Sequence, residues 1–528
     1  MILLLLSCTP DKDAKTADFL LYNGSFRISA EQVVDQIAIK DQRVVAIGEE
    51  ASLWESTSQE DVNGAVILPG FHDSHTHLLA GSFVMERLLL VGISNMSTIQ
   101  NRLRDYAEEN PQEPWIIGFG WIYAQMDNPN GLILDSIVND RPVALFDSSG
   151  HTLMVNSKTL ELAGIDANTP DPVGGSIERD PETGAPNGVL KEKAIELISP
   201  IMLSAYDDDD FEESLSKYLE DFQEAGLSSI SEILAVPGIS LARPQIFAKL
   251  AAENRLPIRV HYYMPAFSRA DLDEIQNISE QYDSDMLRFA GIKLWIDGST
   301  SSGESWSLEP SEQDPDHYGS HYWEEDELYS FIEAAEEHEF GLKLHVNGDA
   351  AVQTVLNALE NYNGILKQTY LLEHAVLLDP LDYARAHDLG VCISVQPGIA
   401  TLGPYSGQAD VWGEEKMEHA WNFAALEEAE ITISLSTDWP VWPTTDIMVN
   451  AWSASVGLGD KSLTPRATLE AYTKNANSCM GLQEGCLDVG CTADLTFLEE
   501  DPYNTPSTEW SNIDIQEVRS AIQFANAP

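Results

Sequence analysis

Apolar runs of strand length alternate with helical patterns through the middle of the chain. The runs cover residues 143–146, 228–234, 258–263, 292–296, 342–346, 370–375, 391–395 and 431–436, and the helical patterns cover 211–225, 325–338, 350–361 and 464–476. Alternation of this kind is typical of a parallel sheet whose strands are joined by helices. Because about eight such repeats occur, the pattern predicts an α/β fold closed into a TIM-type (β/α)8 barrel over residues 69–477.

The sequence near both ends of the chain predicts short strands outside the barrel pattern. Near the N-terminus the apolar runs are 19–22, 36–39, 44–47 and 66–68, and turn residues such as Asn23 and Gly24 separate some of them. Similar pieces occur at 493–498 and 518–524. Because each set of strands is too small to be stable alone, we expect residues 17–68 and 478–528 to pack together as one small β domain.

The chain is long and strongly acidic. Its 528 residues suffice for a barrel and a smaller domain, and 86 acidic against 29 basic residues give a net charge of −57. This charge argues against a nucleic acid or an anionic membrane surface as partner. Two interpretations of the acidity remain: a solvated acidic coat, which is the usual role of charge runs, and an acidic trap for cationic substrates.

The cysteines and the N-terminus bear on location. The five cysteines are too few and too scattered for a disulfide framework, although Cys486 and Cys491 are close enough in sequence to pair. Residues 1–16 begin with an apolar run that ends in Ser7 and Cys8, which resembles a bacterial lipobox but lacks a positive leader. We interpret this segment as a truncated signal and tether, which predicts a cell-envelope lipoprotein anchored at Cys8. If the segment is an ordinary apolar terminus, the protein is cytoplasmic.

The string PGFHDSHTH at residues 69–77 carries the first candidate chemistry. His75 and His77 are two residues apart at the end of a predicted strand, so both side chains point to one face. Two imidazoles that converge in this way make half of a metal site.

Three more polar residues end apolar runs further along the chain. His345, His374 and Asp438 each stand at the carboxyl end of a predicted strand. In a parallel barrel those ends share one rim, where active sites lie. A lone histidine at a strand end is usually structural, but this many at successive strands favours a common site.

A lysine inside an apolar run is the remaining candidate. Lys293 lies within residues 291–299, where burial of an unpaired ammonium is costly. A lysine that reacts with CO2 becomes a carbamate, an anionic ligand able to bridge two metal ions. The alternative is an ion pair with a carboxylate such as Asp297. Lys343 is a rival for the bridging role, because it shares a face with His345.

Taken together, the motifs resemble the amidohydrolase superfamily, specifically its YtcJ-like branch (amidohydrolase type 3). The matching strings span residues 62 to about 502: PGFHDSHTH, SSGHTLMVN, GIKLWIDGS, LKLHVNGD, LLEHA, STDWPV, LTPRATLEAYTKNAN and GCLDVGCTADLTFLEEDP. The resemblance implies that one or two divalent metals, most simply Zn2+, bind His75, His77, Lys293, His345, His374 and Asp438. It also implies that the terminal strands form a β-sandwich and that residues 80–200 hold a lid or specificity insertion.

The same resemblance implies hydrolysis of a C–N bond other than a peptide bond, in an amide, N-acyl or N-formyl amine, or cyclic amide. A metal-activated hydroxide attacks the carbonyl carbon, while Asp438 acts as general base and then acid. Glu373, Asn347 and Asp349 are candidates to orient the histidines. The substrate-binding candidates are His151, Asn156, Gln396, Trp121, Trp306 and Trp439.

Other functions stay open at this stage. The same metal core serves deaminases of heterocycles, and a non-catalytic relative would keep the fold as a ligand-binding or anchored surface protein. The filled ligand positions argue against the non-catalytic alternative, and the sequence lacks Gly-x-Ser-x-Gly, His-Glu-x-x-His and phosphate-loop motifs. The partners we expect are a small-molecule substrate, no nucleic acid, and a second copy of the chain in a homodimer.

Overall fold

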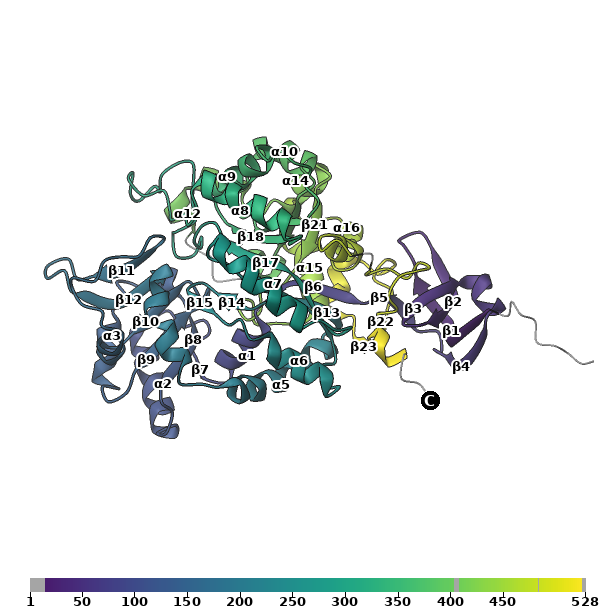
Figure 1. Ribbon diagram of the computed structural model, residues 1–528, viewed down its shortest axis with the longest axis horizontal. Coiled ribbons are helices and arrows are strands. Elements are labelled where there is room, and N and C mark those ends of the chain that lie inside the picture. Colours follow the sequence, from purple (N-terminus) through teal and green to yellow (C-terminus); the bar gives the residue numbers. More distant parts are fainter. Residues whose placement is uncertain (1–14, 403–407, 483, 525–528) are drawn as a thin grey trace, which may run out of the picture.

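Eight parallel strands form a barrel at the centre of the computed structural model, which describes residues 15–402, 408–482 and 484–524 (Figure 1). In chain order the strands are β6 (Phe71–Thr76), β13 (Leu227–Ile233), β16 (Arg259–Pro265), β17 (Leu287–Trp295), β18 (Leu342–Val346), β19 (Tyr370–His374), β20 (Cys392–Val395) and β21 (Thr432–Leu435). Each pairs with the next in parallel. The ring closes just beyond β21, where Asp438 N donates to the carbonyl of His75 at 2.9 Å.

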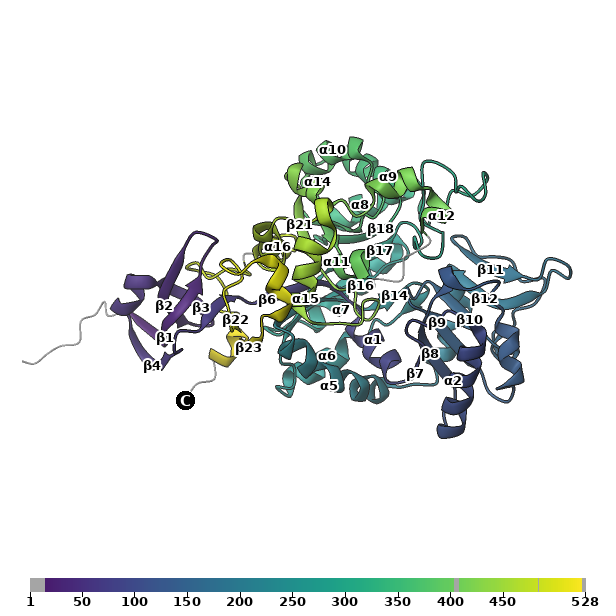
Figure 2. The ribbon, with the colours of Figure 1, turned by 180° about the vertical axis from the view of Figure 1, so that it is seen from behind.

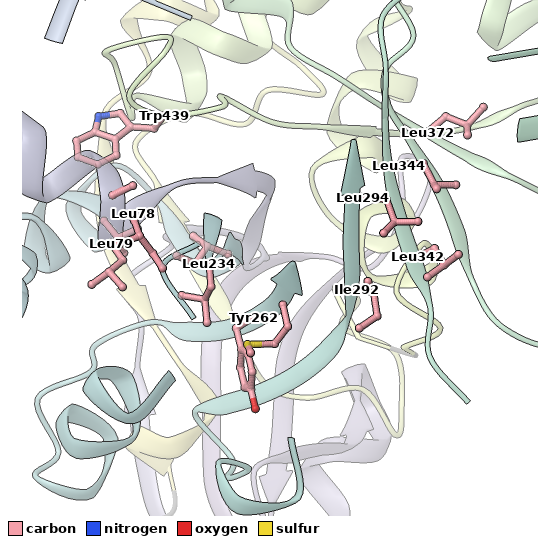
Figure 3. Packing of buried hydrophobic residues seen from close by; sticks show 14 of the residues in the cluster. Leu78, Leu79, Leu234, Tyr262, Ile292, Leu294, Leu342, Leu344, Leu372 and Trp439 are labelled. Atoms are coloured by element: carbon pink, nitrogen blue, oxygen red, sulfur yellow. The ribbon is translucent and has the colours of Figure 1, made fainter. Parts of the chain in front are cut away.

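Alternation along the strands separates an apolar from a polar face. Ile292 and Leu294 of β17 lie opposite Leu342 and Leu344 of β18, and Figure 3 shows these side chains packed together. The intervening residue Lys293 therefore points to the other face, into the barrel. The strand pattern thus explains how a buried strand carries a charged residue without losing its apolar packing surface.

Helices follow the strands and cover the barrel. α5 (Asp208–Glu224), α8 (Glu325–Glu337) and α9 (Asp349–Glu360) lie where helical periodicity predicts them. The predicted helix at 464–476 is wrong as a single element, because it is broken at Thr473 into α16 (Pro465–Ala471) and α17 (Lys474–Ser478).

Strands from both ends of the chain share a second sheet, away from the barrel (Figure 1). Its members are β1 (Thr16–Arg27), β2 (Val33–Lys40), β3 (Arg43–Ile47), β4 (Glu55–Asp61), β5 (Val66–Pro69), β22 (Leu495–Leu498) and β23 (Ile515–Arg519). β5 pairs with β22, which ties the two ends together. Phe26, Ile67 and Phe497 belong to one buried cluster of this sheet.

Three details of this sheet differ from the sequence predictions. Asn23 and Gly24 do not separate two strands but lie inside β1, where the register shifts between Tyr22 and Phe26. The run at 518–524 is not one strand, because β23 ends at Arg519 and a 3-10 turn follows. β4 was not predicted, since its sequence ESTSQED has no apolar alternation.

A third sheet is inserted after the first barrel strand. It contains β7 (Leu88–Leu89), β8 (Ile116–Trp121), β9 (Val143–Asp147), β10 (Thr152–Val155), β11 (Gly175–Arg179) and β12 (Pro186–Glu192), with α2 (Met96–Glu109) and α3 (Ser157–Ala163) beside them. Figures 1 and 2 show it on the side of the barrel opposite the terminal sheet. The run at 143–146 is therefore not a barrel strand, and the second barrel strand is β13.

Two disulfides link described cysteines. One joins Cys486 and Cys491, a pairing that the sequence leaves open, and the other joins Cys392 and Cys479, which the sequence does not predict. Cys8 lies outside the described residues. Within the described residues, no helix combines the length and the apolar composition that crossing a bilayer requires.

Candidate active site

The predicted ligand residues meet at the carboxyl ends of the barrel strands. His75, His374 and Asp438 each offer one ligand atom, and these atoms all lie within 4.8 Å of one another. His77, Lys293 and His345 line the same cavity as this triad. Ring centroids lie 5.1 Å apart for His75 and His77, and 4.6 Å apart for His345 and His374. The rim therefore brings together all six predicted side chains, which lie at the ends of five separate strands.

Two of these residues have unusual backbone conformations. His374 has φ 73° and Asp438 has φ 57°, in the left-handed region that side chains other than glycine seldom adopt. Asp438 Oδ1 then lies 3.2 Å from His77 Nε2 and 3.6 Å from His75 Nε2. Backbone strain of this kind persists where the surrounding structure enforces it, and it is concentrated at functional sites.

Hydrogen bonds behind the site fix how the imidazoles face it. His75 Nδ1 lies 2.7 Å from a carboxylate oxygen of Glu373, and His374 Nδ1 lies 2.8 Å from the amide oxygen of Gln396. Both acceptors require a proton on Nδ1, which leaves the Nε2 lone pairs free to bind a cation. Glu373, a candidate for orienting the histidines, and Gln396, a candidate for binding substrate, thus both fix a histidine ring from behind.

The electrostatics of the triad suit a divalent cation. Burial lowers the pKa of His75 to about 3 and that of His374 to about 4, so both rings are neutral at pH 7. Burial by itself would raise the pKa of Asp438. The nearby imidazoles of His75 and His77 have the larger, opposite effect and hold that pKa well below its usual range. Neutral imidazoles and an ionised carboxylate are the forms that bind metals.

Buried polar atoms provide a test of that fit. The buried His77 Nδ1 has no hydrogen-bond partner among the described residues, and the buried Asp438 Oδ1 faces the Nε2 atoms of His77 and His75 at 3.2 and 3.6 Å. A buried polar atom without a partner is costly, and a cation bound at this site would remove that cost. The residues present therefore fit a divalent metal with nitrogen and oxygen ligands.

The two buried lysines have different surroundings. Lys343 Nζ lies 2.8 Å from Glu373 Oε1 and also donates to the carbonyl of Ser74, so its charge is paired with a carboxylate. Across the described residues, no carboxylate oxygen lies within 4.0 Å of Lys293 Nζ, and burial lowers the Lys293 pKa to about 8.

Asp297 is not the partner of Lys293 that the alternative interpretation required. Its carboxylate accepts hydrogen bonds from the backbone N–H groups of Trp306, Asn347 and Gly348, at 2.7–2.9 Å. Lys293 is thus the lysine whose amine remains available at the cavity.

His151 is the one predicted substrate residue that lines the cavity. Its ring lies 5.1 Å from that of His345, and its Nδ1 lies 2.6 Å from Glu192 Oε2. Sequence reasoning missed Glu192, which also accepts from Tyr322 Oη at 2.6 Å. No local pattern marks Glu192, because its partners come from three separate segments. His151 lies just before β10 and Glu192 ends β12, so both residues belong to the insertion and not to the barrel.

The other predicted substrate residues from the insertion serve its structure. Asn156 caps α3 and also donates to the carbonyls of Val138 and Arg141. Trp121 is fully buried and donates to the carbonyl of Leu145. Neither residue is among those that line the cavity.

The remaining predicted substrate residues also lie off the cavity wall. Gln396 stands behind His374, Trp306 stacks on His321 with ring centroids 4.6 Å apart, and Trp439 packs against Phe222. Asp349, a candidate for orienting the histidines, instead pairs with Lys416 at 3.0 Å. The side chains that do wall the cavity include Phe83, Phe119, Phe146 and Phe211, which no sequence motif distinguished from ordinary core residues.

Comparison with protein families and known proteins agrees with the motifs. A family model described as "Amidohydrolase family" (Amidohydro_3) matches residues 60–519. The chain is 28% identical over 467 residues to the "Putative amidohydrolase YtcJ" of Bacillus subtilis, covering 85% of this chain and 86% of that protein. It is 25% identical over 535 residues to the "N-substituted formamide deformylase" of Arthrobacter pascens, covering 94% of this chain and 96% of the relative.

A solved structure shares the fold. The crystal structure of an uncharacterized metal-dependent hydrolase from Pyrococcus horikoshii aligns with a TM-score of 0.74 and 24% sequence identity. The alignment covers 93% of this chain and 99% of that one. The barrel, the terminal sheet and the insertion therefore make up a known architecture.

Proposed function

Because the chain belongs to the amidohydrolase family, we propose that it is a metal-dependent hydrolase that cleaves a C–N bond other than a peptide bond in a small molecule. Its substrate is an amide, an N-acyl or N-formyl amine, or a cyclic amide. The observation that carries the proposal is the triad of His75, His374 and Asp438 within one cavity. The formamide deformylase relative, which aligns over nearly its whole length, supports the bond type.

We propose zinc as the metal, since imidazole nitrogens and a carboxylate are its common ligands. His75, His77, His345, His374 and Asp438 would hold one or two ions. When bound, such an ion supplies a Lewis acid that acidifies water and polarises a carbonyl group.

Asp438 is the proposed proton carrier. Its carboxylate is ionised and buried, with Oδ1 turned toward the imidazoles of His75 and His77 in the cavity, so it can accept a proton from the attacking water. The same carboxyl group then gives that proton to the leaving nitrogen, which departs as an amine. His151, held by Glu192, lines the cavity beside His345 and is positioned to hydrogen-bond a polar group of the substrate.

Lys293 is the proposed site of carboxylation. Its Nζ would add to the carbon of CO2, forming an N–C bond and releasing one proton to solvent. The product is an anionic carbamate, which would add an oxygen ligand to the metal site. The absence of any carboxylate within 4.0 Å of Nζ, among the described residues, supports this role.

We also infer that the protein works in the cell envelope of a bacterium. The disulfides Cys392–Cys479 and Cys486–Cys491 support this, because such bonds persist in oxidising compartments and are rare in the cytosol. Alkylation of free thiols in envelope and cytosolic fractions tests it. A lipid anchor at Cys8 stays a prediction.

Metal content and hydrolysis, measured together, test the proposed function. We expect about two zinc ions per wild-type chain, as in two-metal hydrolases, and turnover of some N-formyl amines, N-acyl amines or cyclic amides. Lys293→Ala should lower the metal content to one ion or none and abolish turnover. Lys367→Ala, which removes an exposed lysine, should leave both unchanged.

Two outcomes would redirect the proposal. Ammonia release from heterocyclic amines, without amide hydrolysis, would favour a deaminase. A wild-type protein that is purified without metal and stays inactive after zinc is restored would favour a ligand-binding relative.

A further inference from the structure

The cavity extends beyond the triad of His75, His374 and Asp438, and apolar side chains line this further part. We call this part the apolar chamber and define it by Phe83, Phe119, Phe146, Leu203, Phe211 and Ile239. These six residues come from α1 (Leu78–Met85), the inserted sheet, α4 (Ser199–Leu203), α5 and the hairpin β14 (Ala235–Val236) and β15 (Ile239–Ser240). The inserted sheet thus completes, with barrel elements, a compartment that opens onto the triad.

Charge is almost absent from the cavity wall. Apart from histidines, the charged residues among the described lining are Lys293 and Asp438, and both lie beside the triad of His75, His374 and Asp438. The chain has 86 acidic residues, yet none of them faces the apolar chamber among the described lining. The cavity is therefore not an acidic trap for cationic substrates.

The walls of the apolar chamber are held by packing. Phe83 stacks on Phe211 with ring centroids 4.3 Å apart, and Tyr206 packs edge-on against Phe83 at 4.9 Å. Phe119 and Phe146 are buried in the inserted sheet. A preformed apolar wall favours a ligand of matching shape, because little side-chain ordering accompanies binding.

The size of the cavity limits what it admits. Its volume is about 100 Å³. An apolar cavity of roughly 150 Å³ binds benzene, so this smaller one admits a short alkyl chain and, at most, a single ring.

We propose that the apolar chamber binds the hydrocarbon arm of a neutral amide, so that the substrates are small amides bearing one alkyl or single-ring aryl group. Derivatives that carry a carboxylate or an ammonium on that arm should bind poorly, because the six side chains that define the chamber carry neither a charge nor a hydrogen-bonding group. This inference rests on the proposed hydrolase function for its chemistry, but the binding preference follows from the wall itself.

A series of N-formyl amines tests the proposal on the zinc-loaded enzyme. From N-formyl methylamine to N-formyl butylamine, kcat/KM should rise about fourfold per methylene, the gain expected for burying each one. N-formyl benzylamine should be a good substrate. N-formyl β-alanine and the mono-formyl derivative of 1,4-diaminobutane should be at least about 100-fold poorer than the butyl compound. Equal turnover of the charged and neutral compounds would overturn the proposal while leaving the hydrolase function intact.

A variant that fills the apolar chamber provides a second test of the proposal. Leu203 is half-buried, so Leu203→Trp can occupy the chamber with little strain on the fold. It should lose the butyl and benzyl substrates by at least about 10-fold and keep the methyl compound. Leu162→Trp, at an exposed leucine of α3, is the matched control and should behave as wild type.

Binding of benzyl alcohol, measured by calorimetry, separates the two hypotheses. If no amide is hydrolysed, the proposed function fails, but the titration still tests the chamber. Binding in the wild type and Leu162→Trp, with loss in Leu203→Trp, supports the chamber. Unchanged binding in Leu203→Trp, or no binding in the wild type, would overturn it.

Discussion

His151 Nδ1 lies 2.6 Å from Glu192 Oε2, and this contact ties the residue before β10 to the end of β12. Glu192 also accepts hydrogen bonds from the backbone N–H of Ser299 at 3.1 Å and from the hydroxyl of Ser302 at 2.9 Å. Its own backbone has φ 55° and ψ −130°, which is costly for a residue with a side chain. The fold therefore maintains this carboxylate, and through it the orientation of the His151 ring.

Glu192→Gln should lower kcat by about 10- to 100-fold, the usual effect of losing a group that orients a functional side chain. The metal content should stay at the wild-type value, because Glu192 does not touch the triad. Glu196→Gln, which alters an exposed carboxylate four residues away, is the control. Steady-state kinetics and metal analysis of both variants check this, and a wild-type kcat in Glu192→Gln would remove His151 from the mechanism.

The buried pair of Lys343 and Glu373 should behave as a unit, with Nζ and Oε1 2.8 Å apart. Lys343→Met leaves an uncompensated buried carboxylate and should lower the free energy of unfolding by about 3–5 kcal/mol. The double variant Lys343→Met/Glu373→Gln should recover much of that stability. Its metal affinity should still be reduced, because His75 loses the carboxylate that orients it.

Chemical denaturation and metal titration of the wild type, both single variants and the double variant measure the coupling. A double variant whose loss of stability equals the sum of the single losses would contradict a coupled pair.

His72 should make the fold sensitive to acid. Burial lowers its pKa to about 3, with Lys343 adding to the effect, and both ring nitrogens lie within 3.0 Å of serine hydroxyls. In the unfolded chain the ring titrates near pH 6.5, so only the unfolded state gains a proton between pH 6.5 and about 3. The stability that the neutral His72 ring contributes is fully present above pH 6.5. Below pH 6.5 the free energy of unfolding falls by about 1.4 kcal/mol per pH unit.

Equilibrium unfolding between pH 7 and 4.5 tests that slope. His72→Asn, which cannot titrate, should show a shallower dependence by about one proton over this range. His387→Asn, at a half-exposed histidine, should keep the wild-type slope. An unchanged slope in His72→Asn would mean that another group is responsible.

The two disulfides should contribute unequally to stability. Cys392 and Cys479 are 87 residues apart in sequence, whereas Cys486 and Cys491 are five apart. Since a cross-link restricts the unfolded chain more when it closes a longer loop, loss of the first should cost about 4–5 kcal/mol and loss of the second about 2 kcal/mol. Unfolding of Cys392→Ser/Cys479→Ser and Cys486→Ser/Cys491→Ser checks the order, and reducing agent should destabilise each variant further, because each keeps one of the two bonds.

The local sequence pattern was enough to predict the residues that meet at the carboxyl ends of the barrel strands. His345, His374 and Asp438 each follow an apolar run, and parallel strands bring such ends to one rim, so position in the sequence translated directly into position in space. The orienting residue Glu373 lies next to His374 and was a candidate for the same reason. Family motifs added that Lys293 belongs with them.

The insertion could not be predicted in the same way. The run at 143–146 has the length and apolarity of a barrel strand, and nothing local distinguishes a strand of one sheet from a strand of another. Glu192 gained its role only from contacts with distant segments. The tryptophans Trp121, Trp306 and Trp439 are large and apolar, which fits a pocket wall and a core equally well. Which phenylalanines face the cavity depends on how the inserted sheet packs on the barrel.

The pairing of β5 with β22 has a consequence for synthesis on the ribosome. Leu68 and Thr496 are direct partners across the two strands, yet roughly 430 residues separate them, which at about 5–20 residues per second means some 20–90 s of translation. Until then β5 has an open edge, and edges of this kind recruit other strands. Cells that make this protein rapidly should therefore need a holdase for the nascent chain, and slower translation should not relieve the requirement.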